Sequence, residues 1–208
     1  TKPDAENDTD FGEVSVSASS VDHTFTIQND GPGTLTISSI SIAGLHAADF
    51  TVTRQPAESV PAGDVTAFTI TFDPAATGVR EAEVSIACND ADENPYTFAI
   101  LGTGLTHLQA WRLLHFGTTA STGIAANGFD ADKDGITNLV EFAFGLHPRR
   151  AGGNLPQPVT TAGSITYTFP QPALVSGITY RVEWSTSLAA GDWTAIPDTG
   201  TAARPTQG

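Results

Sequence analysis

Acidic and amide side chains recur at regular spacing in twelve residues near the middle of the chain. Asp130, Asp132 and Asp134 alternate with other residues, Gly135 follows, and Asn138 and Glu141 come later in the same stretch. Calcium prefers hard oxygen ligands, and side chains at positions 1, 3 and 5 of such a loop converge on one point when the chain curls tightly. The spacing therefore predicts a Ca²⁺ site.

Each position of this stretch has a predicted role. Gly135 permits the sharp turn because it has no Cβ to clash. We expect Ile136 to supply its backbone carbonyl, Asn138 to contribute directly or through water, and Glu141 to bind with both carboxylate oxygens. The predicted metal ligands are Asp130, Asp132, Asp134, Ile136, Asn138 and Glu141.

Four carboxylates without a cation repel one another, so we expect metal binding to be linked to the folding of this segment. The alternative interpretation is an acidic surface loop with no metal. Only one such loop is present and the chain has no methionine. Calcium sensors usually pair two loops and expose a methionine-rich groove. A structural site is thus favoured over a switch.

The charge balance excludes some classes of partner. The chain has 23 acidic and 9 basic side chains and a net charge of −14, so nucleic acid is not an expected partner. No apolar run approaches the roughly 18 residues that predict a membrane span. Cys88 is the one cysteine, so no intrachain disulfide forms.

No catalytic constellation is evident in the sequence. The five histidines lie in unrelated contexts, and no nucleophile motif such as G-x-S-x-G is present. The sequence therefore predicts a protein that is not an enzyme.

The elements around the loop are mostly strands. Residues 21–101 alternate apolar and polar side chains in short runs that turn residues separate, which predicts an immunoglobulin-like antiparallel β-sandwich. The apolar positions are Phe25, Ile27, Leu35, Ile37, Ile40, Ile42, Phe50, Val52, Phe68, Ile70, Phe72, Ala82, Val84, Ile86, Tyr96, Phe98 and Ile100.

Helical spacing predicts short helices over residues 106–116 and 137–146, the second ended by Pro148. Alternation returns near Tyr167 and Tyr180 and predicts further strands. The fold is therefore expected to be mainly β, with a short helix–calcium loop–helix unit and a further small β region. The predicted domains are residues 1–104, 105–150 and 151–208.

Two parts of the chain resemble known families. The sandwich resembles the choice-of-anchor D repeats of bacterial surface proteins, which are related to Hydin-like immunoglobulin folds. The phrases that carry this likeness lie at residues 24–29, 49–52, 72–74, 89–96 and 102–104. Residues 108–148 look like the dockerin-like or thrombospondin-type-3-like segment of large secreted proteins of the Verrucomicrobia and Planctomycetes group. There a β module similar to residues 163–196 often follows.

The resemblance implies an exported, multi-domain, surface-associated parent of which this chain is a piece. We expect a non-catalytic, calcium-stabilised structural or adhesive module, located outside the cell or on the bacterial surface. Its expected partners are neighbouring domains or copies of the same protein.

Two alternative functions stay open. In the first, a strand of the next subunit fills an exposed sandwich edge and builds an extracellular filament, with residues 1–11 or the C-terminal strands as donors. In the second, the chain is a carbohydrate-binding accessory module of a secreted enzyme, directed at a surface polysaccharide. Tyr180, Trp184 and Trp193 would then stack on a sugar ring, although a core row is the commoner use of such spacing.

Overall fold

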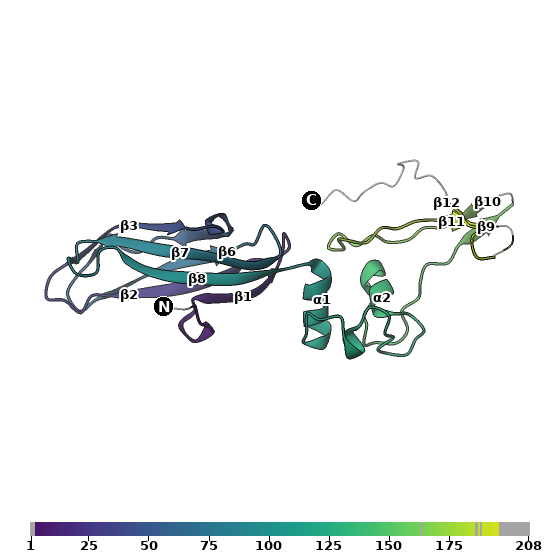
Figure 1. Ribbon diagram of the computed structural model, residues 1–208, viewed down its shortest axis with the longest axis horizontal. Helices are drawn as coiled ribbons and strands as arrows, with labels where there is room; N and C mark the ends of the chain where they lie inside the picture. The colour runs from purple at the N-terminus through teal and green to yellow at the C-terminus, as the bar shows by residue number, and fades with distance from the viewer. Residues whose placement is uncertain (1–2, 163, 186, 188, 196–208) are drawn as a thin grey trace. The chain divides into compact units, whose positions relative to one another are not determined.

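The computed structural model describes residues 3–162, 164–185, 187 and 189–195 (Figure 1). It divides into two compact units, residues 1–121 and residues 122–208. The predicted three-part division at residues 104 and 150 stays a prediction. Each unit is considered by itself below.

The first unit is a β-sandwich. A five-stranded sheet has the order β1-β8-β7-β3-β5, and a three-stranded sheet has the order β2-β6-β4. The strands are β1 (Asp10–Ser15), β2 (Val21–Gln28), β3 (Leu35–Ala43), β4 (Phe50–Arg54), β5 (Ser59–Val60), β6 (Val65–Phe72), β7 (Gly78–Cys88) and β8 (Tyr96–Leu105). Short 3₁₀ turns η1 (Ala5–Asn7) and η2 (Ala47–Asp49) and helix α1 (His107–Phe116) complete it.

The core follows from the alternation of side chains along each strand. Phe68, Ile70 and Phe72 of β6 point inward and are buried, and Val84 and Ile100 of the facing sheet meet them. Successive strand residues point to opposite faces, so a period-two pattern buries one face of each sheet. The predicted mainly β, immunoglobulin-like fold is confirmed.

Two glycines in β8 are required by close packing. A Cβ at Gly102 would lie 2.4 Å from the Phe72 ring, and one at Gly104 would lie 2.2 Å from the Ala76 carbonyl oxygen. Real Cβ atoms do not approach other atoms so closely. Glycine therefore lets β8 lie against Phe72 of the opposite sheet at Gly102 and against the β6–β7 connection at Gly104.

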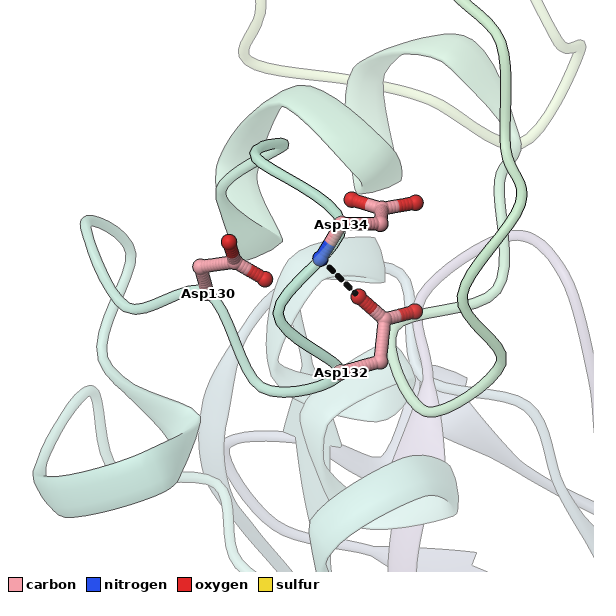
Figure 2. Close-up of side chains that lie close together, drawn as sticks. All are labelled: Asp130, Asp132 and Asp134. Atoms are coloured by element: carbon pink, nitrogen blue, oxygen red, sulfur yellow. Dashed lines mark hydrogen bonds between the residues drawn. The ribbon is translucent and has the colours of Figure 1, made fainter.

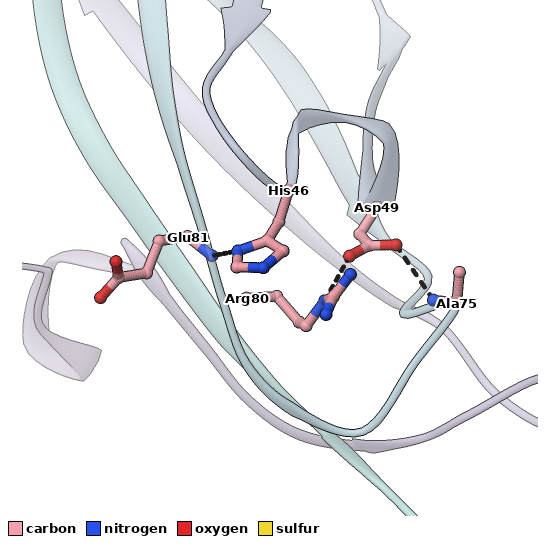
Figure 3. Close-up of polar contacts among 5 residues, drawn as sticks. All are labelled: His46, Asp49, Ala75, Arg80 and Glu81. Atoms are coloured by element: carbon pink, nitrogen blue, oxygen red, sulfur yellow. Dashed lines mark hydrogen bonds and ion pairs between the residues drawn. The ribbon is translucent and has the colours of Figure 1, made fainter.

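A buried ion pair closes one end of the sandwich (Figure 3). Asp49 is 4% exposed and accepts hydrogen bonds from Arg80 Nε at 2.5 Å and from the Ala75 backbone N–H at 3.0 Å. Beside it, His46 Nδ1 accepts a bond from the Glu81 backbone N–H at 3.0 Å. The buried carboxylate is thus fully partnered within its own unit.

The second unit holds the predicted loop and little regular structure. Its elements are η3 (Gly123–Ala125), α2 (Asn138–Phe144), β9 (Val159–Thr161), β10 (Ser164–Thr166), β11 (Glu183–Trp184) and β12 (Thr194–Ala195). β9 pairs with β10 and β11 with β12 as two separate two-stranded sheets. The predicted strands of this region are found in part, as β10 and β11, but Tyr167 and Tyr180 themselves lie outside them.

The two predicted helices form, with one corrected end. Helix α1 starts with a capping box in which Thr106 Oγ1 accepts from Gln109 N–H and Gln109 Oε1 accepts from Thr106 N–H. Helix α2 ends before Gly145 at φ 69°, not at Pro148 as predicted, because glycine adopts the left-handed cap at no steric cost. Within the described residues, no helix is long and apolar enough to cross a membrane.

The Asp49 ion pair predicts a stability effect. Asp49→Ala leaves the largely buried Arg80 guanidinium and the Ala75 N–H without their acceptor, so the free energy of unfolding should fall by about 2–3 kcal/mol. Urea unfolding followed by circular dichroism measures it. Asp64→Ala, which removes an exposed carboxylate of equal charge, is the control and should change stability by less than about 0.5 kcal/mol. Equal effects of the two variants would contradict a stabilising role for the pair.

Candidate metal centre

Three of the predicted ligands converge in the second unit. Asp130, Asp132 and Asp134 each offer a carboxylate oxygen, and these oxygens lie within 4.8 Å of one another (Figure 2). All three are partly buried on the loop that leads into α2. A group of oxygens this close can surround a single cation.

Backbone hydrogen bonds hold Asp130 in this position. Its Oδ1 accepts from the Lys133 N–H at 2.7 Å, and its Oδ2 accepts from the Gly135 N–H at 2.8 Å. The turn needs positive φ angles, 66° at Lys133 and 92° at Gly135. The sequence predicted a sharp turn at Gly135, and the positive φ angle there confirms that the backbone favours glycine at this position.

The next two aspartates are held in the same way. Asp132 Oδ1 accepts from the Asp134 N–H at 3.2 Å, the bond drawn in Figure 2, and Asp134 Oδ1 accepts from the Ile136 N–H at 2.9 Å. Each carboxylate thus folds back on the residue two positions later, as aspartate does in turns. The backbone N–H groups of the loop thus hold the three aspartate side chains in position.

Glu141 closes the loop from the first turn of α2. It is 1% exposed, and burial, followed by the charges of Asp132, Asp134 and Asp130, raises the pKa of its carboxyl from 4.5 to about 7. Glu141 is not one of the residues whose oxygens lie within 4.8 Å of one another, but the charges of the three aspartates act on its carboxyl. A buried carboxylate beside like charges is unfavourable unless a cation or a proton compensates.

Three oxygens of predicted ligands are buried without a hydrogen-bond partner. They are Asp132 Oδ2, Asn138 Oδ1 and Glu141 Oε2. Buried polar atoms are nearly always satisfied by protein, water or an ion. Orphaned oxygens on residues at the third, ninth and twelfth positions fit a hard cation such as Ca²⁺, which prefers oxygen ligands.

Asn138 has a second role that sequence reasoning missed. Its Nδ2 donates to the carbonyls of Ile124 and Ala126, each at 2.8 Å, and its backbone N–H donates to Phe129 O at 2.8 Å. The side chain therefore ties the start of α2 to η3, and only its Oδ1 remains for a metal or water. The predicted carbonyl ligand, Ile136, lies in the loop with its side chain buried.

A later segment also contacts the loop. The Gly152 backbone N–H donates to Asp134 Oδ2 at 3.3 Å. The sequence gave no sign of this bond, because the two residues are 18 positions apart in the chain. The state of the loop is thus connected to the segment that follows α2.

The described part of the chain holds no second group of three or more clustered histidine, cysteine or acidic side chains of metal-binding geometry. Four of the five histidine rings bond to backbone atoms: His23 to Asp8 O, His46 to Glu81 N, His107 to Val16 O and His147 to Arg149 N. These rings have structural partners. That the protein is not an enzyme stays a prediction.

The first unit matches a family model. Residues 5–103 match the model described as HYDIN/CFA65/VesB-like, Ig-like domain. The sandwich is therefore an Ig-like domain, and the Hydin-like part of the predicted resemblance is confirmed. The likeness of residues 108–148 to dockerin-like segments stays a prediction.

Several solved structures are similar in part. A protein of unknown function from Porphyromonas gingivalis W83 is 21% identical with a TM-score of 0.39, over 45% of this chain and 42% of that one. The secreted serine protease VesC from Vibrio cholerae is 12% identical with a TM-score of 0.38, over 51% and 24% of the two chains. The chain thus spans less than half the length of either protein. No curated protein shows a significant match.

The geometry at Glu141 predicts its effect on metal affinity. We expect the parent chain to bind one calcium ion in isothermal titration calorimetry. Glu141→Gln removes the negative charge of a buried predicted ligand, so the calcium dissociation constant should rise at least about tenfold. Glu58→Gln, an exposed change in the sandwich, is the matched control and should bind like the parent. Unchanged affinity in the Glu141 variant would rule out this carboxylate as a ligand.

The tie made by Asn138 predicts a separate effect. Asn138→Asp keeps a side-chain oxygen but removes both N–H donors, leaving the carbonyls of Ile124 and Ala126 unpaired. We expect unfolding of the second unit in EGTA to become easier by about 2–3 kcal/mol. Thermal unfolding monitored by amide signals of residues 122–145 tests it. If the variant loses stability only in the presence of calcium, the structural role of the two hydrogen bonds is contradicted and Asn138 acts only as a metal ligand.

Proposed function

We propose that the chain is a non-catalytic, calcium-stabilised structural or adhesive module of a secreted bacterial cell-surface protein. The observation that carries the proposal is the set of buried, unpartnered oxygens on Asp132, Asn138 and Glu141 beside the three clustered aspartates. A cation bound there stabilises the second unit by mass action, by about 2.7 kcal/mol when its concentration is a hundredfold above its dissociation constant.

The Ig-like domain supports the location outside the cell. The family model names VesB, and VesC, which is similar in structure, is described as a secreted protease. Millimolar calcium outside cells is enough to fill even a weak extracellular site. Partners would be neighbouring domains or copies of the same protein.

A carbohydrate-binding role is a second candidate. A cavity of about 450 Å³ in the second unit is lined by α2 and by residues 167–182, and includes Phe144, Tyr167, Phe169, Tyr180 and Arg181. Aromatic faces beside polar groups suit a sugar ring. The predicted sugar-stacking residue Trp193 is 45% exposed, and the side chain of Trp184 lies outside the described residues.

Calcium should protect the segment after α2 from proteolysis. Without the ion the repelling carboxylates open the loop and release the Gly152 N–H from Asp134 Oδ2. We expect trypsin to cleave after the exposed Arg149 and Arg150 about tenfold faster in EGTA than in calcium, as followed by mass spectrometry.

Cleavage after Arg54, an exposed residue of the sandwich, serves as the internal control and should not respond to calcium. Magnesium at the same concentration tests selectivity, because it demands a smaller, near-octahedral site. Equal cleavage after Arg150 with and without calcium would refute a stabilising role. Turnover of a glycan, peptide or ester by the pure chain would refute the non-catalytic part.

A further inference from the structure

The edge of the larger sheet is only half covered. β1 pairs in parallel with β8 from Asp10 opposite Leu101 to Ser15 opposite Leu105. β8 itself begins at Tyr96, so its first half, Tyr96 to Ile100, has no strand on that side among the described residues. β1 and β8 lie side by side at this edge (Figure 1).

The direction of the free backbone groups follows from the ladder. The Leu101 N–H donates to Thr9 O at 3.0 Å, so Leu101 faces the β1 side. Along a strand, alternate residues direct their N–H and C=O groups to the same side. Thr97 and Ala99 therefore direct their backbone N–H and C=O groups to the uncovered edge. Phe98 and Ile100 direct theirs toward β7, with which β8 pairs.

A groove lined by both aromatic and polar side chains lies beside this edge. It has a volume of about 390 Å³ and runs between β8 and β2, the outer strand of the smaller sheet. Phe25, Phe68 and Phe98 line it, with the Phe25 ring 5.3 Å from each of the other two. Tyr96, at its mouth, is 48% exposed. Unpaired backbone groups next to apolar side chains are the two features that strand addition uses.

Charge indicates what kind of strand fits. Residues 1–104 carry 16 acidic and 3 basic side chains, a net charge of −13, and Asp8 lines the groove itself. A second copy of the sandwich would bring the same negative surface, and Phe11, near its N-terminus, is buried in its own core. Like charges placed together disfavour association.

We propose that this groove binds an extended segment of another polypeptide, neutral or basic, with apolar residues at alternate positions. The segment adds as a strand to Tyr96–Ile100 and places its apolar side chains over Phe25 and Phe98. This inference goes beyond the proposed function, because no predicted calcium ligand belongs to the groove.

The experiment uses the full chain and a nine-residue peptide that alternates valine or isoleucine with threonine or lysine. We expect saturable one-to-one binding by calorimetry. In amide hydrogen exchange the N–H groups of Thr97 and Ala99 should become protected, while those of Phe98 and Ile100, already paired with β7, should not change. A peptide with glutamate in place of lysine should bind at least about tenfold more weakly at low salt.

Ala99→Pro is the blocking variant. It removes an N–H that faces the open edge, where proline is tolerated, and should weaken peptide binding at least about tenfold with little change in melting temperature. Asp8→Asn is a second variant that does not depend on proline. Asparagine tolerates the left-handed backbone of residue 8, at φ 60°, so the fold should be kept. The lost negative charge should weaken binding of the basic peptide alone.

Three results would overturn the proposal. The first is no binding of the basic peptide by the parent chain. The second is equal binding by the Ala99→Pro variant, or protection confined to residues outside β8. The third is concentration-dependent self-association in sedimentation that Ala99→Pro abolishes, because the occupant would then be a second copy of this chain.

Discussion

The second unit depends on how the charge of its buried carboxylates is compensated. Oxygens of three aspartates lie within 4.8 Å of one another, and their charges act on the buried carboxyl of Glu141. At an effective dielectric constant of about 20, two unit charges 4.8 Å apart repel by about 3.5 kcal/mol. Two or three such repulsions rival the entire stability of an ordinary domain, roughly 5–15 kcal/mol. A divalent cation reverses the sign of this contribution.

The same interaction decides whether α2 exists as a helix. Seven residues are too few for a stable isolated helix, since roughly 12–15 are needed even for favourable sequences. Helix α2 gains its order from Asn138 at its start, from Gly145 at its end, and from the buried side chains of Phe142 and Ala143. Glu141 lies between these anchors. If the proposed metal binds, we therefore expect its binding and the formation of the helix to be one cooperative event.

The sequence predicted what is local and missed what joins distant residues. Calcium-loop spacing is contained in twelve residues, so its aspartates and the turn at Gly135 were predictable. The parallel pairing of β1 with β8 joins residues some ninety positions apart, and no period reveals it. The bonds from Asn138 to Ile124 and from Gly152 to Asp134 were missed for the same reason.

The two units satisfy buried charge in opposite ways. In the sandwich, Asp49 finds Arg80 and a backbone N–H inside the same fold, so its stability needs nothing from solution. In the second unit the charges of Asp132, Asp134 and Asp130 act on the buried carboxyl of Glu141, and its Oε2 has no hydrogen-bond partner among the described residues. The sandwich is thus expected to stay folded while the second unit follows the calcium concentration. On the proposed function, calcium is expected to change the part of the chain beyond residue 121 and to leave the groove beside β8 intact.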